Sequence, residues 1–352
     1  MPKIAVIPGD GIGPEVVAEA VKVLQAVDRL EEIGLQLVSF EYGADYYLKT
    51  GVAMPEGQIE TFRKEFDAIF LGALGDPRIP DMAHGRAILL ACRFELDLYI
   101  NLRPVRLIHE RLCPLKEKKP EDINFVVFRE NTEGPYIGAG GFLKKNTPDE
   151  VAIQESVHTR KGVERIIRAA FEYARLHGLP RVTMADKSNV LRFGHDLWQR
   201  VFHEVGDDYP EIEKEHYYID ALAMEMVRAP EHFHVIVTEN MLGDIITDLG
   251  AMLQGGMGMA ASGNINPDGV SLFEPVHGSA PPLAGKNVAN PVAAILTAAM
   301  MLDHLGYVSA ARKIEKAVQR AVHENQMTVD VGGNLGTREV GDYIVRVLEQ
   351  TE

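Results

Sequence analysis

The sequence predicts an α/β protein built on a largely parallel sheet. Short apolar runs typical of buried strands alternate along the chain with longer segments of helical periodicity. The expected strands are residues 3–8, 35–43, 68–75, 123–130, 181–186 and 233–240, and the clearest expected helices are residues 14–27, 162–178 and 290–306. Ligands bind at the carboxyl ends of strands in such folds, so we expect functional side chains on the loops that follow them.

Size and composition are those of a folded globular protein. The chain has 352 residues, of which 46% are hydrophobic and 25% charged, enough for two lobes or one large α/β unit. Its formal net charge of −15 disfavours nucleic acid and anionic lipid as partners. Only Cys92 and Cys113 are present, without a CxxC pair, and the first residues lack an export signal, so the expected location is the cytoplasm.

A glycine cluster, Gly9–Glu15, follows the first expected strand and enters a helix. It lacks the third glycine of the GxGxxG dinucleotide fingerprint, and Pro14 suits a first helical turn. We therefore expect a tight strand-to-helix turn near a ligand, in a fold that is not a Rossmann fold.

Two aspartates in MLGDIITDLGAML, Asp244 and Asp248, are four residues apart and project from one face of an expected helix. Carboxylates on a partly apolar face repel each other unless a cation joins them, and Mg²⁺ or Mn²⁺ suits such oxygen ligands. Asp220, in the apolar segment YYIDALAM, is a candidate third ligand. The alternative is that Asp244 caps the helix start while Asp248 faces solvent.

Three arginines in unusual positions are candidate anion-binding groups. Arg93 lies within an apolar helical pattern, and Arg103 and Arg129 lie at the margins of strand-like segments. A guanidinium group binds a carboxylate through two hydrogen bonds, so three converging arginines would bind a dicarboxylate. The alternative is a set of separate structural ion pairs with Glu95, Asp97 or Glu130.

Further candidates lie on loops after strands. Lys187 could act as a base and Tyr136 as a proton donor, although a surface lysine and a packing tyrosine are the alternatives. The Pro/Gly-rich segment 273–282, which continues to Asn290, suits an adenine and phosphate site or a rigid connection. Residues 135–155 have few helix formers and predict an irregular excursion or a hairpin arm of the kind that mediates dimers.

Together these segments resemble the β-decarboxylating dehydrogenases, the family of isopropylmalate, isocitrate, homoisocitrate and tartrate dehydrogenases. The resemblance covers essentially the whole chain, through IPGDGIGPEV, RFELDLYINLRPVR, FRENTEGPYIG, DKSNVL, YYIDALAM, ENMLGDIITDLGAMLQGG and FEPVHGSAP. It implies a two-lobed isopropylmalate/isocitrate dehydrogenase-like fold. Residues 1–99 and 253–352 would form a first lobe with the cofactor loops, and residues 100–252 a central lobe with the dimer interface and the arm.

The resemblance also implies roles for the site residues. Arg93, Arg103 and Arg129 would bind the substrate carboxylates. The metal, Mg²⁺ or Mn²⁺, would be held by Asp220, Asp244 and Asp248. Lys187, Asp220 and Tyr136 would be catalytic, with Lys187 deprotonating the 2-hydroxyl and Tyr136 protonating the product. Lys187 and Asp220 would act in the partner's site, which implies a homodimer with shared active sites.

The implied cofactor is NAD. Its binding residues would be Ile12, Glu274, His277, Gly278, Ser279, Ala280 and Asn290. NAD-using relatives commonly have an aspartate where this chain has Pro282, and NADP-using relatives have a lysine and a tyrosine there and at the next position. Since neither cation nor tyrosine is present, NAD is expected, with mixed preference as the alternative.

An apolar pocket would select the substrate. Leu89, Leu90 and Val190 suit an isopropyl group, so the expected reaction is oxidative decarboxylation of 3-isopropylmalate to 4-methyl-2-oxopentanoate with reduction of NAD, in leucine biosynthesis. Arg86 leaves tartrate, D-malate or homoisocitrate as alternative substrates. A non-catalytic regulatory subunit is a further alternative, which the intact site positions disfavour.

Overall fold

The computed structural model describes residues 1–350 and confirms the predicted α/β class with mostly parallel strands. The chain divides into two compact units. The first comprises Met1–Leu98, Arg106–Pro120 and the described residues from Ala251 on, and the second comprises Tyr99–Val105 and Glu121–Gly250. The segment 106–120, expected in the central lobe, thus belongs with both ends of the chain.

Five strands of the first unit lie in the order β2-β1-β3-β12-β11. They are β1 (Lys3–Gly9), β2 (Gln36–Ser39), β3 (Ala68–Ala73), β11 (Ala261–Ile265) and β12 (Ser271–Pro275). The first four in this order run parallel, and β11 is antiparallel to β12. Every residue of β3 is buried, as expected for a strand covered on both faces. The carboxyl ends of β1, β2 and β3 therefore meet at one edge of the sheet.

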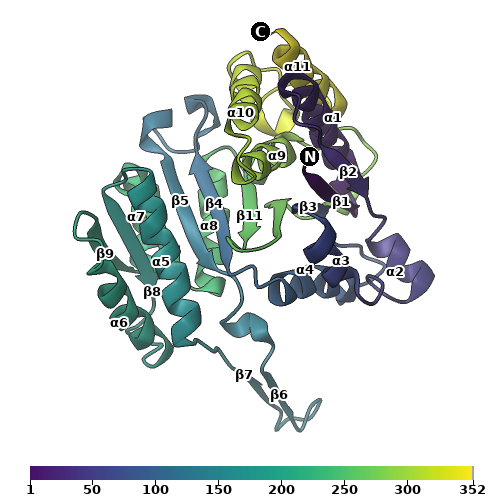
Figure 1. The fold of residues 1–352 in the computed structure, drawn as a ribbon. Helices are drawn as coiled ribbons and strands as arrows, with labels where there is room; N and C mark the ends of the chain where they lie inside the picture. Colours follow the sequence, from purple (N-terminus) through teal and green to yellow (C-terminus); the bar gives the residue numbers. More distant parts are fainter. Residues whose placement is uncertain (351–352) are drawn as a thin grey trace. The chain divides into compact units, whose positions relative to one another are not determined.

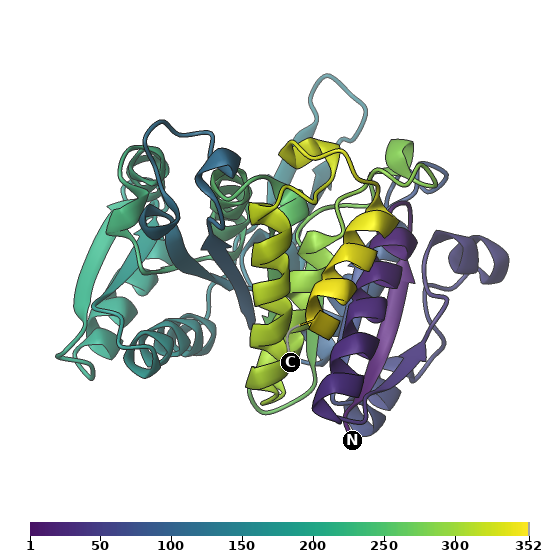
Figure 2. The same cartoon turned by 90° about the horizontal axis from the view of Figure 1, so that it is seen from above.

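Helices cover both faces of this sheet. The helices of this unit are α1 (Gly13–Glu31), α2 (Ala44–Thr50), α3 (Gln58–Glu65), α4 (Ala83–Glu95), α9 (Val292–His304), α10 (Val308–His323) and α11 (Thr337–Gln350). Helix α1 packs with α9, α10 and α11, and Figure 2 shows α1, α10 and α11 side by side. On the other face, Phe62 of α3 and Ile88 and Cys92 of α4 pack against Ile69 and Leu71 of β3.

The second unit has its own strands and helices. The strand order is β4-β5-β10-β8-β9, and β5, β10, β8 and β9 are parallel. The strands are β4 (Ile100–Arg106), β5 (Asn124–Glu130), β8 (Arg181–Asp186), β9 (Glu213–Tyr218) and β10 (Val235–Thr238). The helices are α5 (Arg160–Leu176), α6 (Gly194–Gly206), α7 (Ile219–Arg228) and α8 (Asn240–Leu253). Helix α5 packs over β5, β8 and β10, and α7 packs on β8 and β9.

The stretch 135–155 contains an antiparallel hairpin of β6 (Gly140–Leu143) and β7 (Val151–Gln154). All eight residues of these two strands are exposed, and Figure 1 shows the hairpin projecting from the second unit. Across residues 1–350, no helix has the length and apolarity needed to cross a bilayer.

Replacement of Phe62 by alanine tests the core of the first unit. Phe62 is fully buried and packs edge-on against Phe40 and Phe66. We expect Phe62→Ala to lower the free energy of unfolding by about 3–5 kcal/mol, since a cavity replaces the ring. Urea denaturation measures this change. Leu176→Ala, at a side chain 76% exposed, is the control and should cost less than about 0.5 kcal/mol. Equal effects of the two substitutions would contradict the described core.

Candidate active site

Helix α8 carries the predicted aspartate pair in the second unit. It begins directly after the buried strand β10, and the Glu239 carboxylate accepts hydrogen bonds from the N–H groups of Met241 and Leu242, at 2.9 and 2.8 Å. Burial raises the pKa of Glu239, while these hydrogen bonds lower it. Asp244 lies in the helix interior, so the alternative that it caps the helix start is wrong. Glu239 caps the helix instead.

Arg129, at the end of β5, lies against the helix face that carries Asp244. Its guanidinium forms an ion pair with Asp244 and donates two hydrogen bonds to Oδ1 of Asn240, at 3.0 and 2.7 Å. A Cβ on Gly243 would lie 2.6 Å from Cγ of Arg129, so only glycine allows this approach. Arg129 is 1% exposed, which makes these anionic and amide partners essential.

Arg103 approaches the same pair of aspartates from β4. Its guanidinium donates to Oγ1 of Thr247 at 2.6 Å and lies 3.6 Å from Asp244 and 4.0 Å from Asp248. Burial raises the pKa of Asp248; Arg103 lowers it and Asp244 raises it further. The two carboxylates are about half exposed, at 44% and 51%. Both carboxylates therefore remain accessible to solvent although the arginines lie beside them.

Tyr136 joins this group from the 3-10 turn Pro135–Ile137. Its hydroxyl donates to Asp244 at 3.1 Å, and the guanidinium of Arg129 lies 5.3 Å from its ring centre. Glu130, considered above as an ion-pair partner, instead accepts hydrogen bonds from Thr132 and from the Glu133 N–H. The ion-pair alternative for Arg129 and Glu130 is therefore wrong.

The other two predicted catalytic residues form a separate pair. Lys187 follows β8, and its ammonium group donates to Asp220, in the first turn of α7, at 2.6 Å. This hydrogen bond lowers the pKa of Asp220. Within residues 1–350, no three His, Cys, Asp or Glu side chains gather as metal ligands. The chain thus brings together two of the three predicted metal ligands, Asp244 and Asp248, without Asp220.

Two residues that orient this site were missed by sequence reasoning. Asn240 and Thr247 hold Arg129 and Arg103 in place. Both lie on the helical face of Asp244, one four residues before it and the other three residues after it. Helical spacing around the aspartates would have identified them.

In the first unit, Arg93 of α4 meets Glu274 of β12. The guanidinium lies 3.4 Å from the Glu274 carboxylate, which also accepts a hydrogen bond from Asn264 at 2.9 Å. Arg93 is 6% exposed. The structure therefore brings together one predicted substrate-binding residue and one predicted cofactor-binding residue.

The predicted cofactor segment packs against the turn after β1. The Ile12 N–H donates to the carbonyl of Ser279 at 2.8 Å. His277 donates through its Nδ1–H to the carbonyl of Gly278 at 3.0 Å, while its buried Nε2 has no partner among the described residues. Burial lowers the pKa of His277. Such an orphaned ring nitrogen fits a site that receives a hydrogen-bonding ligand.

The remaining predicted residues have different surroundings. Asn290 accepts a hydrogen bond from the Val292 N–H at 3.0 Å, at the start of α9, and its amide donates to Asp330 at 3.1 Å. Gly278 is exposed and Ala280 has a left-handed backbone, with φ of 37°. Of the three residues predicted to form an apolar pocket, Leu89 packs against the core, Leu90 is half-buried and Val190 is 65% exposed.

Comparison with known proteins agrees with this architecture. Residues 3–344 match the family described as isocitrate/isopropylmalate dehydrogenase. The 3-isopropylmalate dehydrogenase of Thermobifida fusca is 50% identical over 99% of this chain and 98% of its own length. That of Mycobacterium tuberculosis is 46% identical, over 98% of this chain and all of its own. The crystal structure of isocitrate dehydrogenase from Methylococcus capsulatus superposes with a TM-score of 0.90, at 38% identity over 99% of this chain and all of that one. The chain therefore belongs to the isocitrate/isopropylmalate dehydrogenase family.

Proposed function

We propose that the chain is a 3-isopropylmalate dehydrogenase, which oxidises and decarboxylates its substrate with NAD and a divalent metal in leucine biosynthesis. The observation that carries this proposal is the cluster of Asp244, Asp248, Arg103, Arg129 and Tyr136 in a chain whose relatives at 46–50% identity bear that name. A metal-binding carboxylate pair beside two guanidinium groups suits a 2-hydroxy diacid, because it binds hydroxyl and carboxylate oxygens together.

The arginines supply charge complementarity for the substrate. Arg103 and Arg129 are held by Thr247 and Asn240 with their guanidinium groups beside the open carboxylates. Arg93, in the first unit, is proposed to bind the same substrate. The net charge of −15 repels an anionic substrate. The buried arginines would attract it locally.

The donor set fits Mg²⁺ or Mn²⁺ in part. Asp244 and Asp248 offer adjacent, half-exposed oxygen ligands, while the described chain offers no third acidic ligand beside them. When bound, the metal supplies Lewis-acid stabilisation of negative charge on the substrate oxygens. We propose that Asp220 of the partner subunit completes the set.

Proton transfer is assigned to two side chains. Lys187, as its neutral amine, would accept the proton of the 2-hydroxyl group during oxidation, and Tyr136 would donate a proton to carbon after the carboxylate has left as carbon dioxide. The Tyr136 hydroxyl already lies within the cluster, at 3.1 Å from Asp244. Lys187 lies with Asp220 in this chain and would serve the partner's cluster.

Exposed apolar side chains support a homodimer. Helix α8 presents Met241 and Ile245, and α7 presents Met224 and Val227, each pair on one helical face and between 41% and 66% exposed. A helix face of this kind is typical of an interface between subunits. A second copy covering α7 and α8 would bring Asp220 of one chain to the helix that carries Asp244 of the other. We place this enzyme in the cytoplasm.

NAD is proposed to bind along Ile12 and the segment from Glu274 to Asn290. The buried, orphaned Nε2 of the half-buried His277 and the exposed backbone at Gly278 fit a ligand with ring nitrogens and phosphate oxygens. Pro282 stands where NADP-using relatives have a lysine, so this position offers no charge to a 2′-phosphate.

A substrate panel tests the proposed reaction. With Mg²⁺ or Mn²⁺ and each of NAD⁺ and NADP⁺, we expect kcat/KM for 3-isopropylmalate and NAD⁺ to exceed that for isocitrate, homoisocitrate, D-malate and tartrate by at least about tenfold. An apolar pocket disfavours the additional polar group of isocitrate, homoisocitrate and tartrate, and D-malate lacks the isopropyl group that would fill it. Steady-state production of NADH or NADPH is the measurement. Preference for any other member of the panel would reject the proposed substrate.

The aspartate pair is tested by Asp244→Asn combined with Asp248→Asn. We expect metal-dependent turnover to fall by about 100-fold or more, because the amides bind a divalent cation far less well than carboxylates. Titration of Mn²⁺ followed by its electron paramagnetic resonance should show the parallel loss of binding. Asp268→Asn, at an exposed carboxylate, is the control and should leave both unchanged. Unaltered Mn²⁺ binding by the double variant would reject the assignment.

Complementation between two inactive variants tests the shared site. Lys187→Met and Asp244→Asn should each be inactive alone. If Lys187 serves the partner's cluster, a heterodimer of the two variants has one intact site and one doubly defective site, so co-expression restores activity. Activity assays on the purified, doubly tagged heterodimer measure this. An inactive heterodimer would mean that Lys187 and Asp244 act within the same chain.

A further inference from the structure

Asp10 has a buried charge that the proposed reaction does not use. Its side chain is 5% exposed and lies directly after β1. Oδ1 accepts a hydrogen bond from the Ala44 N–H at 2.6 Å, and Oδ2 accepts one from the Gly75 N–H at 2.8 Å. Nε2 of His84, which is fully buried, also lies 2.8 Å from Oδ2. A buried carboxylate requires such partners, and here three different segments supply them.

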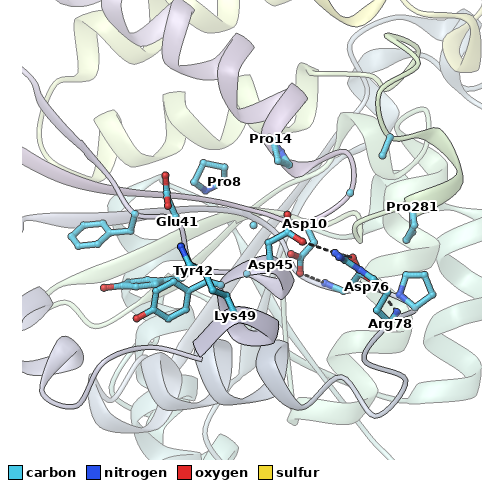
Figure 3. Close-up of a pocket in the computed structure, with 18 of the residues that line it drawn as sticks. Pro8, Asp10, Pro14, Glu41, Tyr42, Asp45, Lys49, Asp76, Arg78 and Pro281 are labelled. Carbon is cyan, nitrogen blue, oxygen red and sulfur yellow. Dashed lines mark hydrogen bonds and ion pairs between the residues drawn. The ribbon is translucent and has the colours of Figure 1, made fainter. Parts of the chain in front are cut away.

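The three partners link the segments that follow β1, β2 and β3. Ala44 is the first residue of α2, Gly75 lies in the loop between β3 and α4, and His84 lies in the first turn of α4. Figure 3 shows Asp10 near Asp45 and Asp76 in the lining of the adjoining cavity. One carboxylate thus holds the loop and two helix starts to the turn after β1.

The loop Gly75–Pro77 is the wall between two cavities of the first unit. On one side lies a cavity of about 1050 Å³, lined by Asp10, Tyr42 and Arg78 among others (Figure 3). On the other side lies a cavity of about 470 Å³, lined by the same loop and by Gly278–Pro281. The second cavity therefore has the proposed cofactor segment as one wall and the loop held by Asp10 as another.

The contacts across this second cavity are close. A Cβ on Gly75 would lie 2.9 Å from Oγ of Ser279, and a Cβ on Gly11 would lie 2.0 Å from the Ser279 carbonyl oxygen. The Ile12 N–H donates to the same carbonyl at 2.8 Å. The loop that Asp10 holds and the turn that follows Asp10 thus touch Ser279 from two sides, so release of either changes the surroundings of that residue.

We propose that Asp10 is a positioning residue for the dinucleotide: through Gly75 and Ile12 it holds the wall formed by the loop Gly75–Pro77 against the segment Gly278–Ala280. The inference rests on the proposed function for the identity of the ligand. The ion pair of Arg78 with Asp45 also links the loop to α2, but both side chains are exposed, Arg78 at 55% and Asp45 at 89%. Exposed pairs contribute little, so the buried carboxylate carries the restraint.

The substitution Asp10→Asn breaks one of the three hydrogen bonds selectively. The asparagine oxygen can still accept from the Ala44 N–H, and His84 can accept from the new amide group as its other tautomer. The amide nitrogen, however, faces the Gly75 N–H, so two donors oppose each other and the loop is released. We expect NADH to bind at least about tenfold more weakly, the effect of losing a buried hydrogen bond to a charged group.

Two control variants separate positioning from general damage. Asp45→Asn makes the same chemical change in the exposed tie and should leave NADH affinity within about twofold of the wild type. His84→Gln keeps a donor for Oδ2 and leaves the Gly75 hydrogen bond in place, so it should also retain affinity. NADH fluorescence, titrated without substrate, measures binding in all four proteins, and hydrogen exchange of the peptide 74–82 reports release of the loop.

If the wild type binds NADH and Asp10→Asn binds it with the same affinity, the inference is overturned and the proposed function stays intact. Failure of the wild type to bind NADH would overturn both. If Asp10→Asn does not fold, hydrogen exchange of the wild type with and without NADH tests the inference. NADH should slow hydrogen exchange of the peptide 74–82 in the full chain, and exchange unaffected by saturating NADH would refute the role of the loop.

Discussion

The repulsion between Asp244 and Asp248 is the constraint on which the candidate site of the second unit depends. Two carboxylates one helical turn apart need cations, and the fold supplies the guanidinium groups of Arg129 and Arg103 from adjacent elements of the same unit. Gly243 allows the closest approach, and Glu239, rather than Asp244, caps the helix start. Both aspartate side chains stay about half exposed beside the arginines, which suits the metal and substrate proposed for this site.

This balance of charge also bears on assembly. The described chain provides two acidic ligands at the cluster and no third, while Asp220 is engaged by Lys187 on another part of the same unit. The proposed site of three carboxylates and a base would therefore be completed by a second chain, and the apolar side chains exposed on α7 and α8 offer a surface for it. The proposed metal site and the proposed dimer rest on the same observation.

The first unit solves a similar problem at Asp10. A carboxylate without a metal or an arginine partner stays buried because two backbone N–H groups and His84 surround it. Since these partners come from three segments, the charge serves as a tether rather than as a reactant. The acidic groups of the two units thus differ in role because one pair is open and the other carboxylate is enclosed.

Local periodicity was enough to predict the α/β class, the strands with continuous apolar runs, and the common helical face of Asp244 and Asp248. The motifs shared with the family then identified the other candidate site residues. The edge strand β9, EKEHYY, was missed because it begins with four polar residues and contains no run of aliphatic side chains. Only the tertiary structure brought Arg129 to Asp244 across 115 positions, chose Thr132 rather than an arginine as partner of Glu130, and gathered Ala44, Gly75 and His84 around Asp10. These contacts join segments that are distant along the chain. The order of the strands in the sheet decides which segments meet, and local sequence patterns do not specify that order.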